Sequence, residues 1–252
     1  MPDRHVLALI PARGGSKSIP RKNLLPINGR PLIAYSIAQA RASARITRVV
    51  VSTDDEEIAE VARASGAEVP FMRPPQLAHD QSTDFDVFDH ALRWLRDQER
   101  YECACVAHLR PTGPVRRVAL IDEAIDTLLG RPDADSLRSV SRPEQTPYKM
   151  WRMADGLLEP LLADAPVPEA HSAPRQLLPA VFWQNGYIDV VRPRTILELR
   201  SMAGRRIVPF IVREPIFELD YPESIGRVEE ALRRLEANEP LHADTVDERH
   251  SV

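Results

Sequence analysis

Short apolar runs alternate in this chain with amphipathic stretches of about a dozen residues, and this alternation constrains the fold more than any other feature of the sequence. The predicted strands are residues 5–10, 48–52, 68–71, 103–109, 136–141, 187–191 and 207–212. The predicted helices are residues 31–42, 53–66, 83–97, 115–129, a segment from 193, and 222–237. The second of these helices would open with a Thr53-Asp-Asp-Glu56 capping box. Strands alternating with helices predict an α/β fold with a mainly parallel sheet covered by helices on both faces.

A proline-rich segment interrupts this order between residues 142 and 180, where seven prolines occur with few long apolar runs. Long irregular insertions in compact domains are usually functional, so we expect a mobile loop or a small excursion ordered by a partner subunit. The length of 252 residues otherwise fits one domain. Residues 1–252 are therefore predicted to form a single domain with the excursion inside it.

The composition is that of an ordinary globular protein, with 43% hydrophobic and 28% charged residues. No apolar run approaches the ~20 residues of a membrane span, and the first residues carry no long apolar segment typical of a secretory signal. A net charge of −4 disfavours nucleic acid as a partner. Cys103 and Cys105 alternate on a predicted strand, so we interpret them as core thiols in a reducing cytoplasm.

Lysine is rare in this chain, because the 33 basic residues comprise 30 arginines and only Lys17, Lys22 and Lys149. A lysine retained in such a background can mark a position where a compact ammonium acts differently from a planar guanidinium. Two of the three lie within six residues of each other in one Gly-containing loop. This clustering favours a functional role for that loop over chance retention.

The loop at residues 12–23 follows the first predicted strand, at the edge where parallel sheets bind ligands. Gly14 and Gly15 would let backbone N–H groups approach an anion closely and form a concave nest. The same loop supplies four cations, which are Arg13, Lys17, Arg21 and Lys22. This combination predicts a site for a triphosphate or another polyanion, although neither a Walker loop nor a dinucleotide fingerprint is present. The alternative is a solvated basic turn.

Two carboxylates near the C-terminus form a second candidate site. Glu218 and Asp220 lie two residues apart on a predicted strand end, so both would face one side. Mg²⁺ is commonly held by one or two carboxylates together with phosphate oxygens. The alternative is an acidic helix N-terminus, which the helix dipole favours without any metal.

The sequence as a whole resembles the acylneuraminate cytidylyltransferase family, over about residues 5–237. The matching stretches are Ile10-Pro-Ala-Arg-Gly-Gly-Ser-Lys17, Pro20-Arg-Lys-Asn23, Val51-Ser-Thr-Asp54, Arg73-Pro-Pro-Gln-Leu-Ala78, Arg110-Pro-Thr-Gly-Pro-Val-Arg116, Pro174-Arg-Gln176, Gln184-Asn-Gly186 and Phe217-Glu-Leu-Asp220. The resemblance implies a nucleotide-binding three-layer α/β fold with a dimerisation excursion at 142–180. It implies a homodimeric enzyme that takes CTP and an acidic acceptor, uses Mg²⁺, releases pyrophosphate and forms a CMP conjugate.

The resemblance also implies roles for individual residues. Arg13, Lys17 and Lys22 would be catalytic, with Lys22 neutralising charge near the α-phosphate. The nucleotide would be bound by Ala12, Arg13, Gly14, Gly15, Ser16, Lys17, Lys22, Asn23, Arg73, Asp80 and Ser82, with Arg73 helping to read cytosine. The acceptor would be bound by Arg110, Thr112, Lys149, Arg175, Gln184 and Asn185. Glu218 and Asp220 would hold Mg²⁺.

Four positions depart from the pattern of the sialic acid enzymes. Arg110 replaces a usual Gln, Trp183 replaces a frequent basic residue, Tyr187 replaces a small residue, and Glu218 replaces the first Asp of the metal pair. A smaller, more cationic pocket would suit a compact, highly charged acceptor, since a dianion recruits Arg readily. Two acceptor classes therefore stay open, an acylneuraminate-type sugar acid and a small phosphonate such as phosphonoformate.

Two other function classes also stay open, a glycosyltransferase-like nucleotide-sugar enzyme and a catalytically silent nucleotide-binding protein. Several further polar residues are interpreted as structural or surface residues. His79, His90 and His108 lack metal-ligand spacing, and the acidic start of the helix at residues 83–97 is interpreted as a solvated, dipole-favoured N-terminus.

Overall fold

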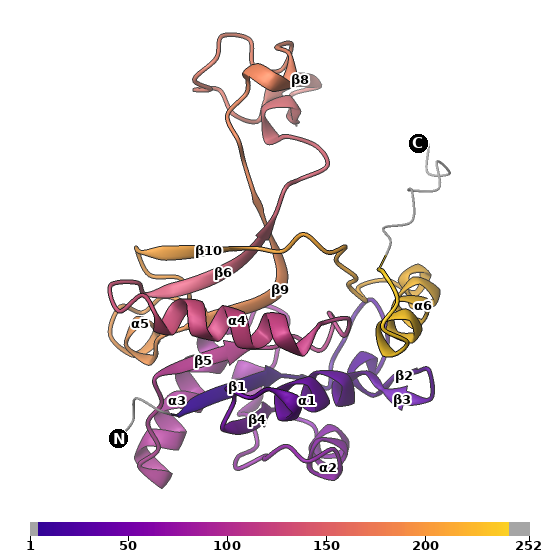
Figure 1. Cartoon of the computed structure of the whole chain (residues 1–252), viewed down its shortest axis with the longest axis vertical. Helices are drawn as coiled ribbons and strands as arrows, with labels where there is room; N and C mark the ends of the chain where they lie inside the picture. The colour runs from indigo at the N-terminus through magenta and orange to yellow at the C-terminus, as the bar shows by residue number, and fades with distance from the viewer. Residues whose placement is uncertain (1–4, 242–252) are drawn as a thin grey trace. The chain divides into compact units, whose positions relative to one another are not determined.

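The computed structural model describes residues 5–241, which fall into two compact units. Among these residues, the core unit comprises 5–139 and 186–241, and the insertion unit comprises 140–185. The main sheet has six strands in the order β10-β6-β9-β5-β1-β4 (Figure 1). Their bounds are β1 Val6–Pro11, β4 Arg48–Ser52, β5 Cys105–His108, β6 Ser136–Ser141, β9 Trp183–Val191 and β10 Ile207–Ile211. The chain passes between the two units along β6 and β9.

The strand β1 lies between two parallel neighbours. Ala8 is in register with Val49 of β4 and with Ala107 of β5, whereas β5 pairs with β9 in the antiparallel sense. The predicted mainly parallel α/β sheet is therefore confirmed. Parallel strands end at one edge of a sheet, so the loops after β1, β4 and β5 lie close together there.

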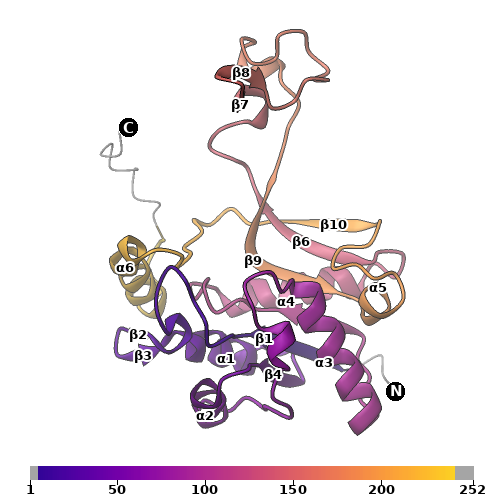
Figure 2. The same ribbon diagram turned by 180° about the vertical axis from the view of Figure 1, so that it is seen from behind.

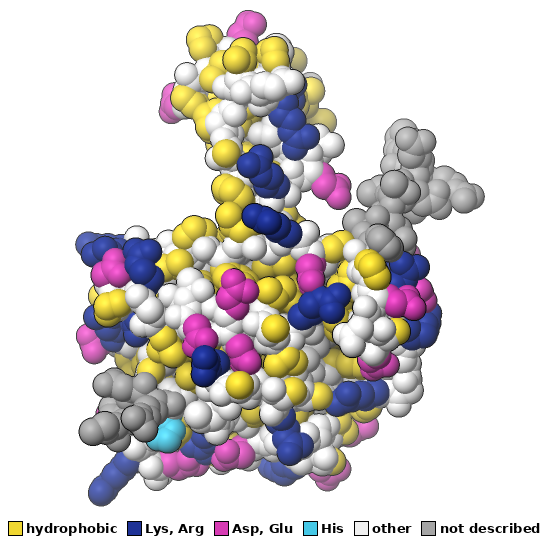
Figure 3. Space-filling view, in the orientation of Figure 1, with side chains coloured by type: hydrophobic (Ala, Val, Ile, Leu, Met, Phe, Trp, Pro, Cys, Tyr) yellow, Lys and Arg dark blue, Asp and Glu magenta, His cyan; other side chains and the backbone are white. Residues whose placement is uncertain are grey.

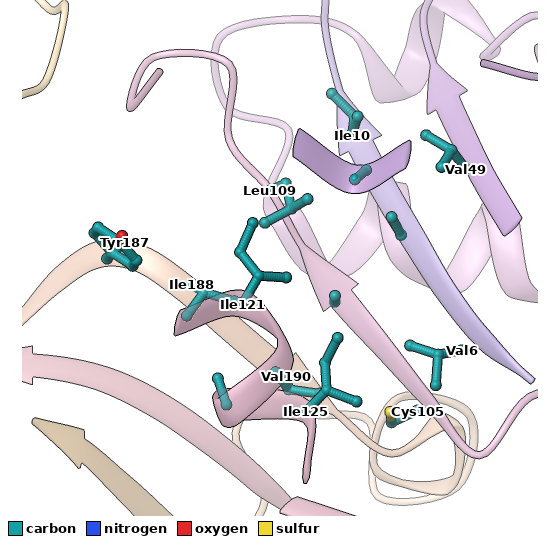
Figure 4. Packing of buried hydrophobic residues seen from close by; sticks show 14 of the residues in the cluster. Val6, Ile10, Val49, Cys105, Leu109, Ile121, Ile125, Tyr187, Ile188 and Val190 are labelled. Carbon is teal, nitrogen blue, oxygen red and sulfur yellow. The ribbon is translucent and has the colours of Figure 1, made fainter. Parts of the chain in front are cut away.

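Helices cover both faces of this sheet, because both faces of its strands carry apolar side chains (Figures 1 and 2). One face packs against α1 (Leu32–Ala42), α2 (Glu56–Ala64) and α4 (Val118–Leu129), as Figure 4 shows for part of this cluster. The other face packs against α3 (Asp84–Glu99) and α5 (Pro193–Leu197). Cys105 belongs to the cluster on the first of these faces, and Cys103 belongs to the cluster on the other. Burial raises the pKa of each thiol to about 12, which is consistent with inert core thiols.

A third apolar cluster orients the C-terminal acidic segment. It joins α6 (Ile225–Glu236) to the small β2–β3 hairpin (Pro26–Ile27 and Arg30–Pro31) and to the start of α1. Phe217 and Leu219 are buried in this cluster. Because neighbouring side chains of an extended chain alternate, Glu218 and Asp220 are directed to the opposite side.

The insertion unit contains a hairpin of β7 (Trp151–Ala154) and β8 (Leu157–Pro160) and two 3₁₀ turns, η4 (Pro147–Lys149) and η5 (Arg175–Leu177). Many of its large apolar side chains are exposed, and apolar side chains cover much of its visible face in Figure 3. They are Met150, Trp151, Met153, Leu157, Leu158, Leu161, Leu162, Leu177, Phe182 and Trp183. A patch of this extent in a soluble domain is typical of a protein-binding surface. In the described part of the chain, no helix combines the length and apolarity that crossing a membrane requires.

Three local predictions are wrong. The second helix begins at Glu56 and is capped by Asp55, whose side chain accepts a hydrogen bond from the Ile58 N–H, instead of by Thr53. The predicted strand at residues 68–71 is reduced to an isolated bridge at Glu68, and a second isolated bridge follows at Met72, since Pro70 has no N–H to continue a ladder. Residues 217–220 lie outside any strand, although their sides alternate as predicted. The predicted polar end at residues 242–252 lies outside the described residues.

Candidate active site

A pocket of about 310 Å³ opens beyond the carboxyl ends of β1 and β5. Most of the predicted nucleotide site lines it, namely Arg13, Gly15, Ser16, Lys22, Asn23, Arg73, Asp80 and Ser82. Two predicted acceptor residues, Arg110 and Thr112, line the same pocket. Residues up to about a hundred positions apart in the sequence thus converge on one cavity in the core unit. Lys17 lies outside the lining with a largely exposed side chain, and Ala12 is buried.

Gly14 of the loop after β1 has a packing role in addition to the role predicted for the glycine pair. The Gly14 N–H donates to Asp54 Oδ1 at 3.1 Å, and a Cβ at Gly14 would lie 2.6 Å from Asp55 Oδ2. Gly14 is therefore required for the close approach of the β4–α2 loop. Neither Gly14 nor Gly15 has a positive φ, so the pair does not form the kind of nest that uses a left-handed residue. Gly15 lines the pocket and borders open space, and its role toward an anion stays a prediction.

Two cations of this loop bind one carboxylate. The Asp80 carboxylate pairs with Arg13 at 2.9 Å and with Lys17 at 2.6 Å. These two cations hold the pKa of Asp80 below its usual range, and Lys17 has the larger effect. Asp80 lies between η3 (Pro75–Leu77) and α3. Its carboxylate occupies donors that the sequence predicts for a triphosphate.

We expect Asp80→Asn to lower the KM for CTP by about two- to fivefold, because phosphate oxygens would no longer compete with Asp80 for Arg13 and Lys17. Steady-state kinetics at low and high salt would measure this. Asp133→Asn is the matched control, since Asp133 is an exposed carboxylate paired with Arg131 and Arg206 away from the pocket. A raised KM in Asp80→Asn would instead make Asp80 a direct ligand of the nucleotide.

Lys22 begins the 3₁₀ turn η2 (Lys22–Leu24), and its ammonium lies 3.3 Å from Asp220 Oδ1. The preceding Arg21 adopts a left-handed φ of 54° and is tied to Asp55 and Glu57, so it points away from the pocket lining. Asn23 Nδ2 donates to the Arg13 carbonyl at 3.0 Å. Asn23 therefore braces the loop in addition to lining the pocket.

Arg73 lines the pocket from a buried position, with only 5% of its surface exposed. Its guanidinium donates to the Ser52 carbonyl at 3.1 Å, and its Nε has no hydrogen-bond partner among the described residues. Burial lowers the pKa of Arg73 below its ordinary value. A buried, partly unsatisfied guanidinium is a donor held ready for a polar ligand.

Glu218 and Asp220 fit a two-carboxylate magnesium site. Burial, and next the neighbouring Asp220, raise the pKa of Glu218. Two like charges held together in this way would be relieved by a divalent cation. No cluster of three or more His, Cys, Asp or Glu side chains suited to a metal occurs in residues 5–241. The remaining ligands would have to be phosphate oxygens or water, as Mg²⁺ prefers.

We expect Glu218→Gln to raise the free energy of unfolding at neutral pH without metal. The raised pKa of Glu218 means that the folded wild type binds this proton more tightly than the unfolded chain does. The stability that this proton contributes is fully present below the unfolded-state pKa and is lost as the pH rises through the folded-state pKa. Gln carries no such charge, so the variant does not lose this stability. The difference between variant and wild type should vanish at acid pH. Thermal unfolding in EDTA from pH 4 to 8 measures it; a less stable variant at pH 8 would contradict the assignment.

The structure corrects two interpretations of single residues. Asp84 is more than a solvated N-terminal acid, because it lines the pocket and accepts from Arg110 at 3.1 Å. Tyr187 does not narrow the pocket, because its ring belongs to the buried apolar cluster of which Figure 4 shows a part. Its hydroxyl accepts a hydrogen bond from the Arg117 N–H. Gly186, with φ of 66°, turns the chain there, and a Cβ at Gly186 would lie 2.7 Å from Glu218 Oε1.

The other predicted acceptor residues belong to the insertion unit. Lys149 is exposed in η4, and Arg175 donates to the carbonyls of Pro143 and Glu144. Gln184 and Asn185 lie in β9, where Asn185 donates to Ser141 Oγ at 2.7 Å. The roles of these four residues stay predictions.

Together, the mainly parallel sheet, the cationic loop after β1 and the adjacent carboxylate pair define an α/β nucleotide-binding protein of the nucleotidyltransferase type. The sequence profile described as "Cytidylyltransferase" matches residues 7–142, which is more than half of the chain. The chain belongs to the cytidylyltransferase family.

Individual relatives agree with this assignment. "Post-translational flagellin modification protein B" of Campylobacter coli is 31% identical over 218 residues, covering 85% of this chain and 89% of the relative. The "Pseudaminic acid cytidylyltransferase" of Campylobacter jejuni is 41% identical over 124 residues, which is 49% of this chain and 53% of that protein. This match thus spans about half the length of the curated relative.

A solved structure shares the fold. A CMP:2-keto-3-deoxy-manno-octonic acid synthetase complexed with CTP superposes with a TM-score of 0.68 at 18% identity, covering 92% of this chain and 99% of the other. At this identity the similarity concerns the fold alone.

Proposed function

We propose that this protein transfers CMP from CTP to an acidic acceptor, an acylneuraminate-type sugar acid, with release of pyrophosphate. The observation that carries the proposal is the convergence of Arg13, Lys22, Arg73 and Arg110 on one pocket beside Asp220. Such a pocket offers cations to a polyphosphate and further donors to a second anionic substrate.

The chemistry follows from these groups. A hydroxyl oxygen of the acceptor attacks the α-phosphorus in line and forms a new P–O bond, while the bond to the oxygen that bridges the α- and β-phosphates breaks and pyrophosphate leaves. The hydroxyl proton passes to solvent. Arg13 and Lys17 hold the phosphates, and Lys22 neutralises charge that develops around the α-phosphorus. Glu218 and Asp220 would hold Mg²⁺, which supplies charge neutralisation and orients phosphate oxygens when bound.

The acceptor class is supported by a relative that is named for pseudaminic acid. A small phosphonate is the second candidate, and Arg110 and Glu218 favour it as departures from the usual Gln and Asp. The argument from Tyr187 no longer supports it, because that ring lies in the core. This leaves the sugar acid as the favoured acceptor.

We also propose a homodimer formed through the insertion unit. Its exposed apolar side chains would be covered by a second copy, and Lys149 and Arg175 would serve the acceptor site of the pair. We expect Leu158→Asp, at a position where 60% of the leucine is exposed, to shift the mass from dimer to monomer. Light scattering after size-exclusion chromatography measures this; a monomeric wild type would contradict the homodimer.

The function is tested by a pyrophosphate-release assay with CTP, Mg²⁺ and a panel of sugar acids and small phosphonates. We expect turnover with CTP and at least one sugar acid. A glycosyltransferase-like enzyme would release nucleoside diphosphate instead, and a silent nucleotide-binding protein would give no turnover. Turnover with ATP or GTP alone would contradict the assignment of cytidine.

A further inference from the structure

Arg110 is fixed at the base of the pocket by two carboxylates. It lies two residues after the end of β5, its NH1 donates to Asp189 Oδ2 at 2.9 Å, and its NH2 donates to Asp84 Oδ2 at 3.1 Å. Its carbonyl oxygen accepts from Arg116 and from Ser36 Oγ, so the backbone is held as well. Both the position and the plane of the guanidinium are thereby determined.

Asp189 lies beneath this arginine on β9, with 2% of its side chain exposed. The same oxygen that binds Arg110 also contacts NH1 of Arg138, which is itself only 13% exposed. His108 is completely buried nearby, and burial, followed by the adjacent arginines, lowers its pKa well below the ordinary value. A neutral His108 adds no charge, so Asp189 is the buried anion on which both arginines depend.

The charges around Arg110 balance. Arg110 and Arg138 are offset by Asp84 and Asp189, and the neighbouring Arg116 and Glu218 add one charge of each sign. Arg110 therefore adds little net positive charge to the pocket, and its main contribution is a set of oriented N–H donors. A guanidinium has five N–H donors, and two of those of Arg110 form hydrogen bonds with the described residues. The side chain is 24% exposed, so free donors face the cavity.

We propose that Arg110 determines acceptor specificity as an oriented hydrogen-bond fork for the oxygens of the acceptor's anionic group, and that Asp189 is the residue that positions it. The inference rests on the proposed function and deepens it, because it specifies which group of the acceptor is read and how. Carboxylates and phosphonates each present two acceptor oxygens on one atom, and a guanidinium fork matches such a pair better than a point charge does.

Substitutions at Arg110 separate geometry from charge. Arg110→Lys keeps the charge and loses the fork, so we expect the acceptor KM to rise by about 10- to 100-fold, corresponding to one or two strong charge-assisted bonds. The KM for CTP should stay within about twofold. Arg110 lies partly at the surface of the pocket, so this variant should fold. An unchanged acceptor KM in Arg110→Lys would overturn the proposal.

Asp189→Asn tests the positioning role. It keeps the shape of the side chain but removes the anion shared by Arg110 and Arg138, so the acceptor KM should rise at least about tenfold with little change for CTP. The double variant with Arg110→Lys should lose little more than either single variant, because both act on one guanidinium. Asp89→Asn is the matched control, since Asp89 binds Arg93 and Arg200 outside the pocket.

The outcomes are distinguishable. If Asp189→Asn fails to fold, Arg110→Lys alone decides the matter. If the wild type turns over an acidic acceptor but the increases in acceptor KM are additive in the double variant, the positioning role of Asp189 is overturned and the proposed function stands. A wild type that turns over no acidic acceptor would overturn the function and this inference together. Running the assays with a sugar acid and with a small phosphonate shows which anionic group the fork reads.

Discussion

Replacement of Lys22 by Ala should lower kcat by about 100- to 1,000-fold, the effect of removing one positioned donor from a charged transition state. Lys22 is the lysine of the loop that lies within the pocket, with 12% of its side chain exposed, and its ammonium lies 3.3 Å from Asp220. Folding should be nearly unchanged, since Lys22 donates no bond that holds the core. The measurement is pyrophosphate release under saturating CTP, with thermal unfolding in parallel.

The control for Lys22→Ala is Arg21→Asn, one residue earlier in the same loop. Arg21 is paired with Asp55 and Glu57 and lies outside the pocket lining, and Asn tolerates its left-handed φ of 54°. This control should keep most of the activity. Near-wild-type turnover in Lys22→Ala, or an equal loss in Arg21→Asn, would remove Lys22 from the mechanism.

Replacement of Asp220 by Asn should lower kcat by about 1,000-fold and increase the Mg²⁺ concentration needed for half-maximal rate. A metal contributes several kcal/mol of charge stabilisation to such a reaction, and Asp220 is the more exposed carboxylate of the pair. Asp220→Asn also leaves the Lys22 ammonium without its anionic partner. Magnesium titrations at saturating CTP measure both effects.

The matched control for Asp220 is Glu223→Gln, which removes a nearby exposed carboxylate in the 3₁₀ turn η6 (Pro222–Ser224). Glu223→Gln should leave the magnesium dependence unchanged. If Asp220→Asn shows wild-type turnover with an unaltered magnesium curve, the carboxylate pair is not the metal site.

The sequence predicted the sheet and the nucleotide loop well, because both depend on local signals. Buried runs such as residues 48–52 match β4 residue for residue, and the loop was marked by its cations and by the strand before it. The alternation from Phe217 to Asp220 also held, since two buried apolar residues direct the two acids together. The prediction that Glu218 and Asp220 face one side depends only on side chains alternating along an extended chain, so it holds although these residues form no strand.

The parts that the sequence did not predict depend on contacts between distant residues. Asp84 has the features of an ordinary helix start, and only its partner Arg110, 26 positions away, makes it part of the pocket. Gly14 fits a phosphate nest by composition, yet the approach of Asp55 explains it. Tyr187 follows a glycine in the left-handed region, and that turn directs its ring into the core.

The central claim is that the loop after β1 binds the phosphates of CTP, and a crystal structure with CTP and Mg²⁺ tests it most directly. The predicted result places phosphate oxygens within hydrogen-bond distance of Arg13, Lys17 and Lys22, with Asp80 displaced from the first two. An unoccupied loop in a crystal where CTP is bound elsewhere on the protein would contradict the account.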